Sequence, residues 1–335
     1  MPYIKNCDRI FVSEKKGEGK MFLSIVVPCF NEEENIRPFY DKTVEELGEL
    51  LNYSEFVFID DGSRDGTLRE LKKLCDEATH KIRVVSFSRN FGKEAGLLAG
   101  LSHTKGDYVA VIDADLQQNP KYINEMLMIL KENPKYDCVA AYQKERNEGK
   151  ILSAFKSLFY RLINKITDIE FYRSASDFRV ISRRMVDAIL ALPEKCRFSK
   201  GIFSWVGFET YFMPYDVEER LRGKSKWSFR KLSSYAVNGI VAFSDKPLIV
   251  SSILGFLLFL VSVVMLLVVV VKTLIFGDPV AGFPTLASLI LGLSGIQLLC
   301  IGILGQYFAK MYEEIKGRPV YLVKESFDNE KDEEK

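Results

Sequence analysis

Three clusters of carboxylates in this 335-residue chain are the residues best suited to chemistry, and each follows an apolar segment. Glu32–Glu34 follow the first segment, Asp60 and Asp61 the second, and Asp113 and Asp115 a later one. Alternating spacing directs Asp113 and Asp115 to the same side of the chain, where both face one ion. Oxygen ligands favour a hard cation, Mg²⁺ or Mn²⁺, which completes its shell with substrate phosphates. The pattern predicts a metal–diphosphate site.

Buried strands and helices alternate along the segments that must position these carboxylates. Such alternation requires crossover connections, so we expect a mostly parallel, Rossmann-like α/β sheet. Ligands bind beyond the carboxyl ends of the strands in such sheets, which is where the clusters fall. One cluster alone is equally consistent with turn chemistry, whereas three at one rim favour a ligand site. The predicted strands span residues 22–28, 56–59, 82–87 and 108–112, and the predicted helices 33–51, 68–75, 93–102 and 120–131.

Composition and missing motifs exclude several other classes. The net charge of +1 gives no case for a nucleic-acid partner. No P-loop is present, and no G-x-G-x-x-G opens a helix, so a dinucleotide site lacks its fingerprint. Six scattered cysteines without a C-x-x-C and only two histidines argue against a disulfide framework or a zinc site. Residues 1–20 are expected to be a flexible arm and not a signal peptide.

Two long uncharged stretches near the C-terminus predict a membrane protein. Residues 248–271 contain 24 residues without a charge, and residues 279–309 contain 31. A bilayer core requires roughly 20 apolar residues in a helix, so we expect transmembrane helices at 247–272 and 280–309. Two buried helices of a large soluble core are the alternative, but soluble helices are rarely apolar on every face.

The segments that flank the spans indicate how the chain meets the membrane. Residues 149–170 form a predicted amphipathic interfacial helix, although a helix packed on the sheet would show the same pattern. A juxtamembrane helix is expected at 226–246. Basic residues outside the spans outnumber those in the loop between them, which places both termini in the cytoplasm. The expected cytoplasmic tail covers 310–335, with 325–335 disordered.

Four sequence blocks carry a resemblance to a known family. They read SIVVPCFNEEENI, FVFIDDGSRDGT, SRNFGKEAGLLAG and DYVAVIDADLQQNP. Residues 22–118 resemble the GT-A nucleotide-sugar-binding domain of the inverting family 2 glycosyltransferases. With two C-terminal spans, residues 22–320 resemble the polyprenyl-phosphate glycosyltransferases, which include dolichol-phosphate mannosyltransferase and the bactoprenol glucosyltransferases. The resemblance implies a catalytic domain over 21–225.

Site residues carry over where the family's motifs match this chain. The resemblance implies nucleotide-sugar contacts by Pro28, Phe30, Glu32, Ile59, Asp61, Lys93, Asp113, Ala114, Asp115 and Gln117. It implies metal binding by Asp113, Asp115 and Gln117, and catalytic roles for Asp115 and Asp177. Contacts to the acceptor or diphosphate are implied for Arg146, Arg179, Arg220 and Lys226. The basic run at 220–226 also suits a patch attracted to anionic lipid.

Asp177 matches the position of the family's proposed catalytic base. A lipid phosphate has a second pKa of about 6, so at neutral pH it is largely ionised and hardly needs a base. Asp177 therefore either orients the sugar or takes up a residual proton, and a purely structural role remains an alternative.

The resemblance implies inverting transfer of a hexose from a nucleotide diphosphate sugar to a polyprenyl phosphate at the cytoplasmic face of a bacterial plasma membrane. UDP-glucose and undecaprenyl phosphate are the first choices, with GDP-mannose, UDP-galactose and UDP-N-acetylglucosamine open as donors. A homo-oligomer is also allowed. The alternatives are a non-catalytic, membrane-anchored nucleotide-sugar-binding protein and a processive polysaccharide synthase.

Overall fold

The computed structural model describes residues 22–143, 175–216, 241, 244–276 and 282–329. The chain divides into two units. One contains a β-sheet with its helices together with the C-terminal segment from Pro319, and the other contains two long helices. The expected arm at 1–20, the interfacial helix at 149–170 and nearly all of the juxtamembrane helix at 226–246 lie outside the described residues.

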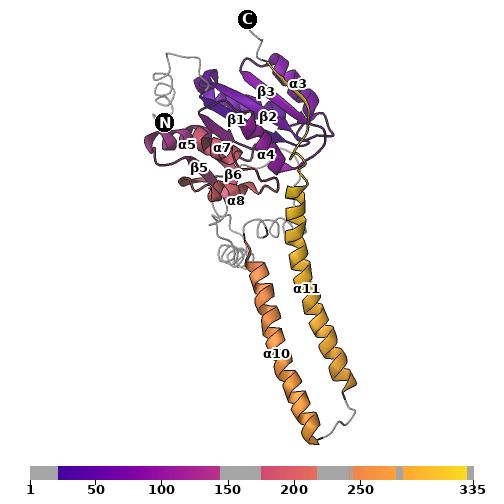
Figure 1. Cartoon of the computed structure of the whole chain (residues 1–335). Coiled ribbons are helices and arrows are strands. Elements are labelled where there is room, and N and C mark those ends of the chain that lie inside the picture. The colour runs from indigo at the N-terminus through magenta and orange to yellow at the C-terminus, as the bar shows by residue number, and fades with distance from the viewer. Residues whose placement is uncertain (1–21, 144–174, 217–240, 242–243, 277–281, 330–335) are drawn as a thin grey trace. The chain divides into compact units, whose positions relative to one another are not determined.

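An eight-stranded sheet forms the centre of the first unit, with the strand order β7-β5-β6-β4-β1-β2-β3-β8 (Figure 1). The neighbours β4, β1, β2 and β3 run parallel to one another, which confirms the predicted α/β fold. The strands are β1 (Leu23–Cys29), β2 (Ser54–Asp60), β3 (Lys81–Phe87), β4 (Tyr108–Val111), β5 (Cys138–Gln143), β6 (Ala175–Ser182), β7 (Thr210–Tyr215) and β8 (Val323–Asp328).

Helices cover both faces of this sheet because its central strands are apolar on both sides. Ile25 and Val27 of β1 belong to a buried cluster that includes residues from α2, α3 and α5. On the other side, Val26 and Pro28 face Gly100 and Gly96 of α4. The helices of this unit are α2 (Ile36–Leu47), the 3₁₀ helix η1 (Gly48–Tyr53), α3 (Thr67–Glu77), α4 (Lys93–Ser102), α5 (Lys121–Glu132), α7 (Arg183–Leu190) and α8 (Ser199–Trp205).

The sheet departs from a simple parallel arrangement beyond β4. Strand β6 lies antiparallel between β4 and β5, and β7 pairs parallel with β5 at the edge. The register pairs Val111 of β4 with Arg179 of β6. Because the strands are antiparallel, this register brings the residue that follows Val111 by two, Asp113, to the end of β6 where Asp177 lies.

The C-terminal segment completes the opposite edge of the sheet as strand β8, antiparallel to β3 (Figure 1). The expectation of disorder over 325–335 is therefore wrong for 325–329, and the expected tail at 310–335 includes a strand of the main sheet. Asn329 explains part of this pairing. Its side chain accepts a hydrogen bond from Ile82 N (2.8 Å) and donates to the carbonyl oxygens of His80 (2.8 Å) and Ala78 (3.3 Å).

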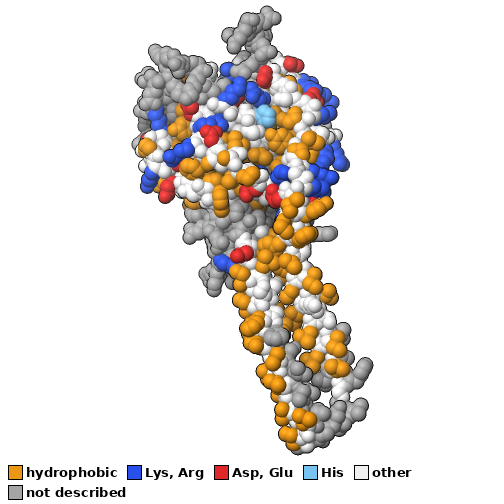
Figure 2. Space-filling view, viewed as in Figure 1, with side chains coloured by type: hydrophobic (Ala, Val, Ile, Leu, Met, Phe, Trp, Pro, Cys, Tyr) orange, Lys and Arg blue, Asp and Glu red, His pale blue; other side chains and the backbone are white. Residues whose placement is uncertain are grey.

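The second unit contains α10 (Lys246–Phe276) and α11 (Phe283–Ile315), which match the two predicted spans. Both are long and apolar enough to cross a membrane, by length and composition. At 1.5 Å per residue, the 31 residues of α10 extend ~46 Å, more than a bilayer core of ~30 Å. The described surface of this unit is largely apolar, whereas charged side chains are spread over the surface of the first (Figure 2).

Candidate active site

The three acidic clusters follow β1, β2 and β4, which are neighbours in the sheet and run parallel. Their carboxyl ends therefore share one rim, as the sequence predicted. Two loops of this rim are bound together in the first unit. Asp61 N donates to Cys29 O (2.9 Å), and Asn31 N donates to Ser63 Oγ (3.0 Å).

A lysine joins two of the predicted site carboxylates. The ammonium of Lys93, at the start of α4, lies 2.9 Å from Asp113 Oδ1 and 2.7 Å from Asp177 Oδ2. The side chains of Lys93, Asp113 and Asp177 are 41%, 30% and 20% exposed, so the cluster is open to solvent-borne ligands. The structure thus brings together three residues that lie 20 and 64 positions apart along the chain.

The electrostatics of this cluster keep Lys93 and Asp177 charged. Burial by itself would lower the pKa of Lys93, but the charges of Asp113 and Asp177 outweigh it and raise that pKa. Burial would raise the pKa of Asp177. The charge of Lys93, followed by those of Lys200 and Arg179, outweighs this effect and lowers the pKa of Asp177 to about 2. A carboxyl with such a pKa is a poor proton acceptor at neutral pH.

The turn that carries Asp113 and Asp115 is held by a glutamine that the sequence reasoning did not select. The Gln118 amide accepts from Asp113 N (3.0 Å) and donates to Asp113 Oδ2 (3.3 Å). Asp115 Oδ1 accepts from Gln117 N (3.2 Å), and Leu116 between them has a φ of 58°. This left-handed residue turns the chain back so that the two carboxylates remain on one short loop.

The carboxylates of Asp113 and Asp115 suit a divalent ion, although they do not by themselves form a complete metal site. Within the described ranges, no group of three or more histidine, cysteine or acidic side chains is arranged to hold a metal. Asp113 and Asp115 supply carboxylate oxygens of the kind that Mg²⁺ and Mn²⁺ take, and such ions complete their shells with phosphate oxygens. An ion at Asp113 would share that carboxylate with Lys93.

Asp61 holds the loop between β3 and α4. Its carboxylate accepts hydrogen bonds from Phe91 N (2.6 Å), Gly92 N (2.9 Å) and Asn90 Nδ2 (2.9 Å). Burial raises the pKa of Asp61, and the backbone hydrogen bonds from the loop oppose that rise. The contact of Asp61 with a nucleotide base stays a prediction, and the hydrogen bonds show that this side chain holds the loop that leads to Lys93.

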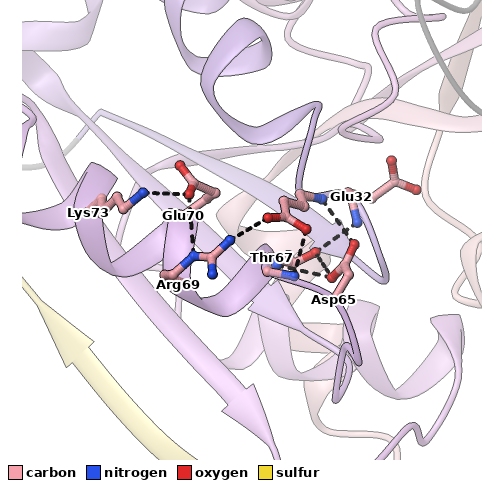
Figure 3. A network of polar contacts seen from close by, with 8 residues as sticks. Glu32, Asp65, Thr67, Arg69, Glu70 and Lys73 are labelled. Atoms are coloured by element: carbon pink, nitrogen blue, oxygen red, sulfur yellow. Dashed lines mark hydrogen bonds and ion pairs between the residues drawn. The ribbon is translucent and has the colours of Figure 1, made fainter.

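A second network binds the loop after β1 to the start of α3 (Figure 3). Glu33 accepts hydrogen bonds from Gly66 N (2.9 Å) and Arg69 Nη2 (2.6 Å). Glu32 N donates to Thr67 Oγ1 (2.8 Å). The Glu33 carboxylate is therefore engaged within the protein, and the Glu32 carboxylate accepts a hydrogen bond from Asn35 Nδ2 (2.6 Å). The contact of Glu32 with a ligand stays a prediction.

The remaining predicted nucleotide-sugar residues differ in exposure. Ile59 and Ala114 are buried, whereas Pro28 and Phe30 are partly exposed. Pro28 and Ile59 both lie next to Gly96 of α4. The predicted acceptor residues Arg146, Arg220 and Lys226 lie outside the described residues.

The family model of glycosyl transferase family 2 matches residues 24–190, which include the whole carboxylate rim. A bactoprenol glucosyl transferase derived from the SfII prophage of Shigella flexneri is 42% identical over 308 residues, covering 91% of this chain and 98% of the relative. The prophage bactoprenol glucosyl transferase homolog of Escherichia coli K12 is 40% identical, covering 91% and 99%. The chain belongs to glycosyl transferase family 2. It is a glycosyltransferase.

A solved structure supports the fold of this glycosyltransferase. Glucosyl-3-phosphoglycerate synthase from Mycobacterium tuberculosis, determined with Mn²⁺, UDP and phosphoglyceric acid, aligns with a TM-score of 0.50 at 19% identity. The alignment covers 71% of this chain and 80% of that one. The likeness confirms the predicted GT-A-like arrangement of a mostly parallel sheet with helices on both faces.

Arg179 of the glycosyltransferase has partners within the protein. It is 4% exposed, and its guanidinium donates to Ser176 O (2.9 Å) and to Asp177 O (3.3 Å). The same guanidinium lies over the ring of Phe203, 3.7 Å from its centroid. These contacts bring α8 to the site, which the sequence reasoning missed. Arg179 and Phe203 are separated by more than twenty residues along the chain, so no local spacing in the sequence indicated their contact.

Proposed function

We propose that this glycosyltransferase moves glucose from UDP-glucose to undecaprenyl phosphate. The observation that carries the proposal is the Lys93–Asp113–Asp177 cluster beside Asp115, in a chain that also has two helices long enough to cross a bilayer. The names of the relatives in Shigella flexneri and Escherichia coli support bactoprenol as the acceptor and glucose as the sugar, because their similarity extends over 91% of this chain.

The proposed reaction is a single displacement at the anomeric carbon. An oxygen of the lipid phosphate forms a bond to that carbon. The bond from the carbon to the diphosphate oxygen breaks, and its electron pair leaves with UDP. The anomeric configuration inverts because attack and departure occur on opposite faces. The attacking phosphate is largely ionised at neutral pH, so no protein base is required.

The residues of the rim divide this task. Asp113 and Asp115 would hold a divalent cation, Mg²⁺ or Mn²⁺, which when bound supplies a Lewis acid to the departing diphosphate. Gln118 fixes the orientation of Asp113, and Gln117 closes the same turn. Lys93 adds a fixed positive charge where the diphosphate develops negative charge. Asp61 and Glu32 line the proposed nucleotide side of the rim.

Asp177 acts in this proposal as a permanent anion and not as a base. Its pKa of about 2 leaves it ionised at every pH at which a cell works. It therefore orients Lys93, with which it forms a 2.7 Å ion pair, and the sugar hydroxyls near it. A carboxylate in this position also opposes the approach of a second anion unless cations accompany that anion.

The proposed location is the cytoplasmic face of a bacterial plasma membrane, with both termini in the cytoplasm. Lys310, Lys316 and Arg318 follow the uncharged stretch of the second span, and Lys246 precedes that of the first. The segment between the two uncharged stretches, residues 272–278, carries Lys272 as its one basic residue. Positive charges remain on the cytoplasmic side, where nucleotide sugars are made. Protease added outside intact spheroplasts should leave the sheet-containing unit uncut.

The test uses the full-length protein in neutral detergent with Mg²⁺ or Mn²⁺, undecaprenyl phosphate and radiolabelled nucleotide sugars. Label from UDP-glucose should enter the organic phase, and Asp115→Ala should abolish this transfer. Asp41→Ala is the matched control, because Asp41 is exposed on α2. Transfer from GDP-mannose, UDP-galactose or UDP-N-acetylglucosamine in preference to UDP-glucose would overturn the assigned sugar. Donor binding without transfer to the lipid would overturn the assigned acceptor.

A further inference from the structure

Helix α8 is fastened to the catalytic rim by a carboxylate that the proposed reaction does not use. Glu94 follows Lys93 on α4, and its Oε2 accepts hydrogen bonds from Ser199 N (2.7 Å) and from Ser199 Oγ. Ser199 is the first residue of α8. Burial raises the pKa of Glu94, and the two hydrogen bonds from Ser199 oppose the rise. The Glu94 carboxylate thus holds the first residue of α8, which fixes the start of this helix beside Lys93.

A second contact holds α8 one helical turn further along. The Arg179 guanidinium lies 3.7 Å from the ring centroid of Phe203, and both residues are buried. Arg179 is two residues from Asp177 on β6, just as Glu94 is one residue from Lys93 on α4. Each residue of the Lys93–Asp177 ion pair thus has a near neighbour along the chain that contacts α8: Glu94 beside Lys93, and Arg179 near Asp177.

These two contacts bracket Lys200. It lies between Ser199 and Phe203 on α8 and is partly exposed. The bracket brings its charge close to Asp177, and that charge contributes to the lowered pKa of this carboxyl. Lys93 is the first cation of the site, and it is already paired with Asp113 and Asp177. Lys200 is therefore a second cation beside the catalytic carboxylate, supplied by a different element.

We propose that Lys200 binds the phosphate group of the polyprenyl phosphate acceptor, and that Glu94 positions Lys200 by holding α8. This inference rests on the proposed function. Two anions meet at the anomeric carbon, and Asp177 adds a third negative charge, so the incoming phosphate needs a fixed cation of its own. An ammonium there lowers the repulsion and holds the attacking oxygen in line. No proton transfer to or from Lys200 is part of this step, because the phosphate oxygen attacks as an anion.

The experiment measures initial rates against undecaprenyl phosphate at saturating UDP-glucose, and then against UDP-glucose at saturating acceptor. Neutral detergent micelles contain no anionic lipid, so a change in the acceptor KM reports the acceptor itself. We expect Lys200→Ala to raise the acceptor KM roughly 10- to 100-fold, the range of a charge-assisted contact. The donor KM and the calorimetric Kd for UDP-glucose should stay as in the wild type. Lys200→Arg should recover most of the loss, and Lys73→Ala, an exposed lysine on α3, should change nothing.

The role of Glu94 is tested with a double-mutant cycle. Glu94→Ala should raise the acceptor KM, and adding Lys200→Ala should raise it little further, because both changes remove the same contact. Glu94→Gln keeps one acceptor oxygen and should recover part of the affinity. Additive effects of Glu94→Ala and Lys200→Ala would overturn the positioning role, since Glu94 would then act independently of Lys200.

The outcomes separate this inference from the proposed function. A wild-type protein that forms no lipid-linked sugar from any donor would refute the proposed function and the inference with it. A wild type that transfers glucose, together with a Lys200→Ala variant of unchanged acceptor KM, would refute the inference alone. A Lys200→Ala variant with a raised donor KM and weakened UDP-glucose binding would assign Lys200 to the donor instead.

Discussion

Lys93 Nζ and Asp177 Oδ2 lie 2.7 Å apart, although they come from a helix and a strand on different parts of the chain. The lysine at the same time contacts Asp113. The cation therefore joins the carboxylate proposed for the metal to the carboxylate aligned with the family's base. This arrangement has direct consequences for the affinity for a metal ion, for the pH dependence of transfer and for the effect of substitutions in the surrounding loops.

Replacing Lys93 with methionine should separate metal binding from catalysis. The ammonium shares Asp113 with any bound ion, so Lys93→Met should bind Mn²⁺ more tightly in the absence of donor, as measured by calorimetric titration. The same change removes a positive charge from the diphosphate side and should slow transfer roughly 100-fold. Lys73→Met is the surface control. An unchanged Mn²⁺ affinity would show that Lys93 does not share the metal carboxylate.

Asp177→Asn should reduce transfer by the same factor at every pH between about pH 5 and pH 8. A carboxyl whose pKa is lowered to about 2 stays ionised over this whole pH window. It loses its charge only as the pH falls through about 2. The ratio of wild-type to variant rates, measured across this window, checks the statement. A ratio that shrinks toward pH 5 would mean that the carboxyl titrates there and serves as a base.

Gly62→Ala should disrupt the donor side of the rim, whereas Gly48→Ala should not. Both glycines have positive φ, 62° and 50°, so an alanine is strained at either position by about 1–3 kcal/mol. A Cβ on Gly62 would also lie 2.4 Å from Arg89 C, on the loop that Asp61 holds, whereas a Cβ on Gly48 meets nothing within 4 Å. The UDP-glucose Kd should therefore rise for Gly62→Ala only, and equal effects on binding would contradict this account.

Asn329→Ala should destabilise the sheet-containing unit. The side chain makes three hydrogen bonds to the backbone of the segment that leads into β3, and their loss leaves partly buried groups unpaired. We expect the free energy of unfolding to fall by about 1–3 kcal/mol in urea titrations in detergent. Asn133→Ala removes one exposed bond and is the control. Equal stability of the two variants would show that the hydrogen bonds of the Asn329 side chain do not stabilise this unit.

The first half of the fold followed from the sequence because its strands are buried on both faces. Runs such as Leu23–Cys29 read as continuous apolar segments, and the helices between them show clear periodicity. The rim was also predictable, since parallel strands end on the same side of the sheet. Asp113, Asp115 and Asp61 therefore lie where their positions along the chain predicted.

The second half depended on pairing that local sequence does not encode. Strand β6 (Ala175–Ser182) mixes charged and apolar residues because one of its ends lines the site, and it enters the sheet antiparallel. Strand β8 (Val323–Asp328) is polar and pairs mainly through its backbone. The contact between Glu94 and Ser199 spans 105 residues, so no spacing rule reveals it.

Strand β8 also sets an order of events during synthesis. It is the last element of the chain that the structure describes. Along the sequence, α10 and α11 come between β8 and the other strands of its sheet. Because chains are made from the N-terminus and domains fold as they emerge, the edge of β3 stays unpaired until α10 and α11 have left the ribosome. The enzyme completes its sheet only after both long apolar helices have been made, so the catalytic unit is the last part of the described chain to be finished.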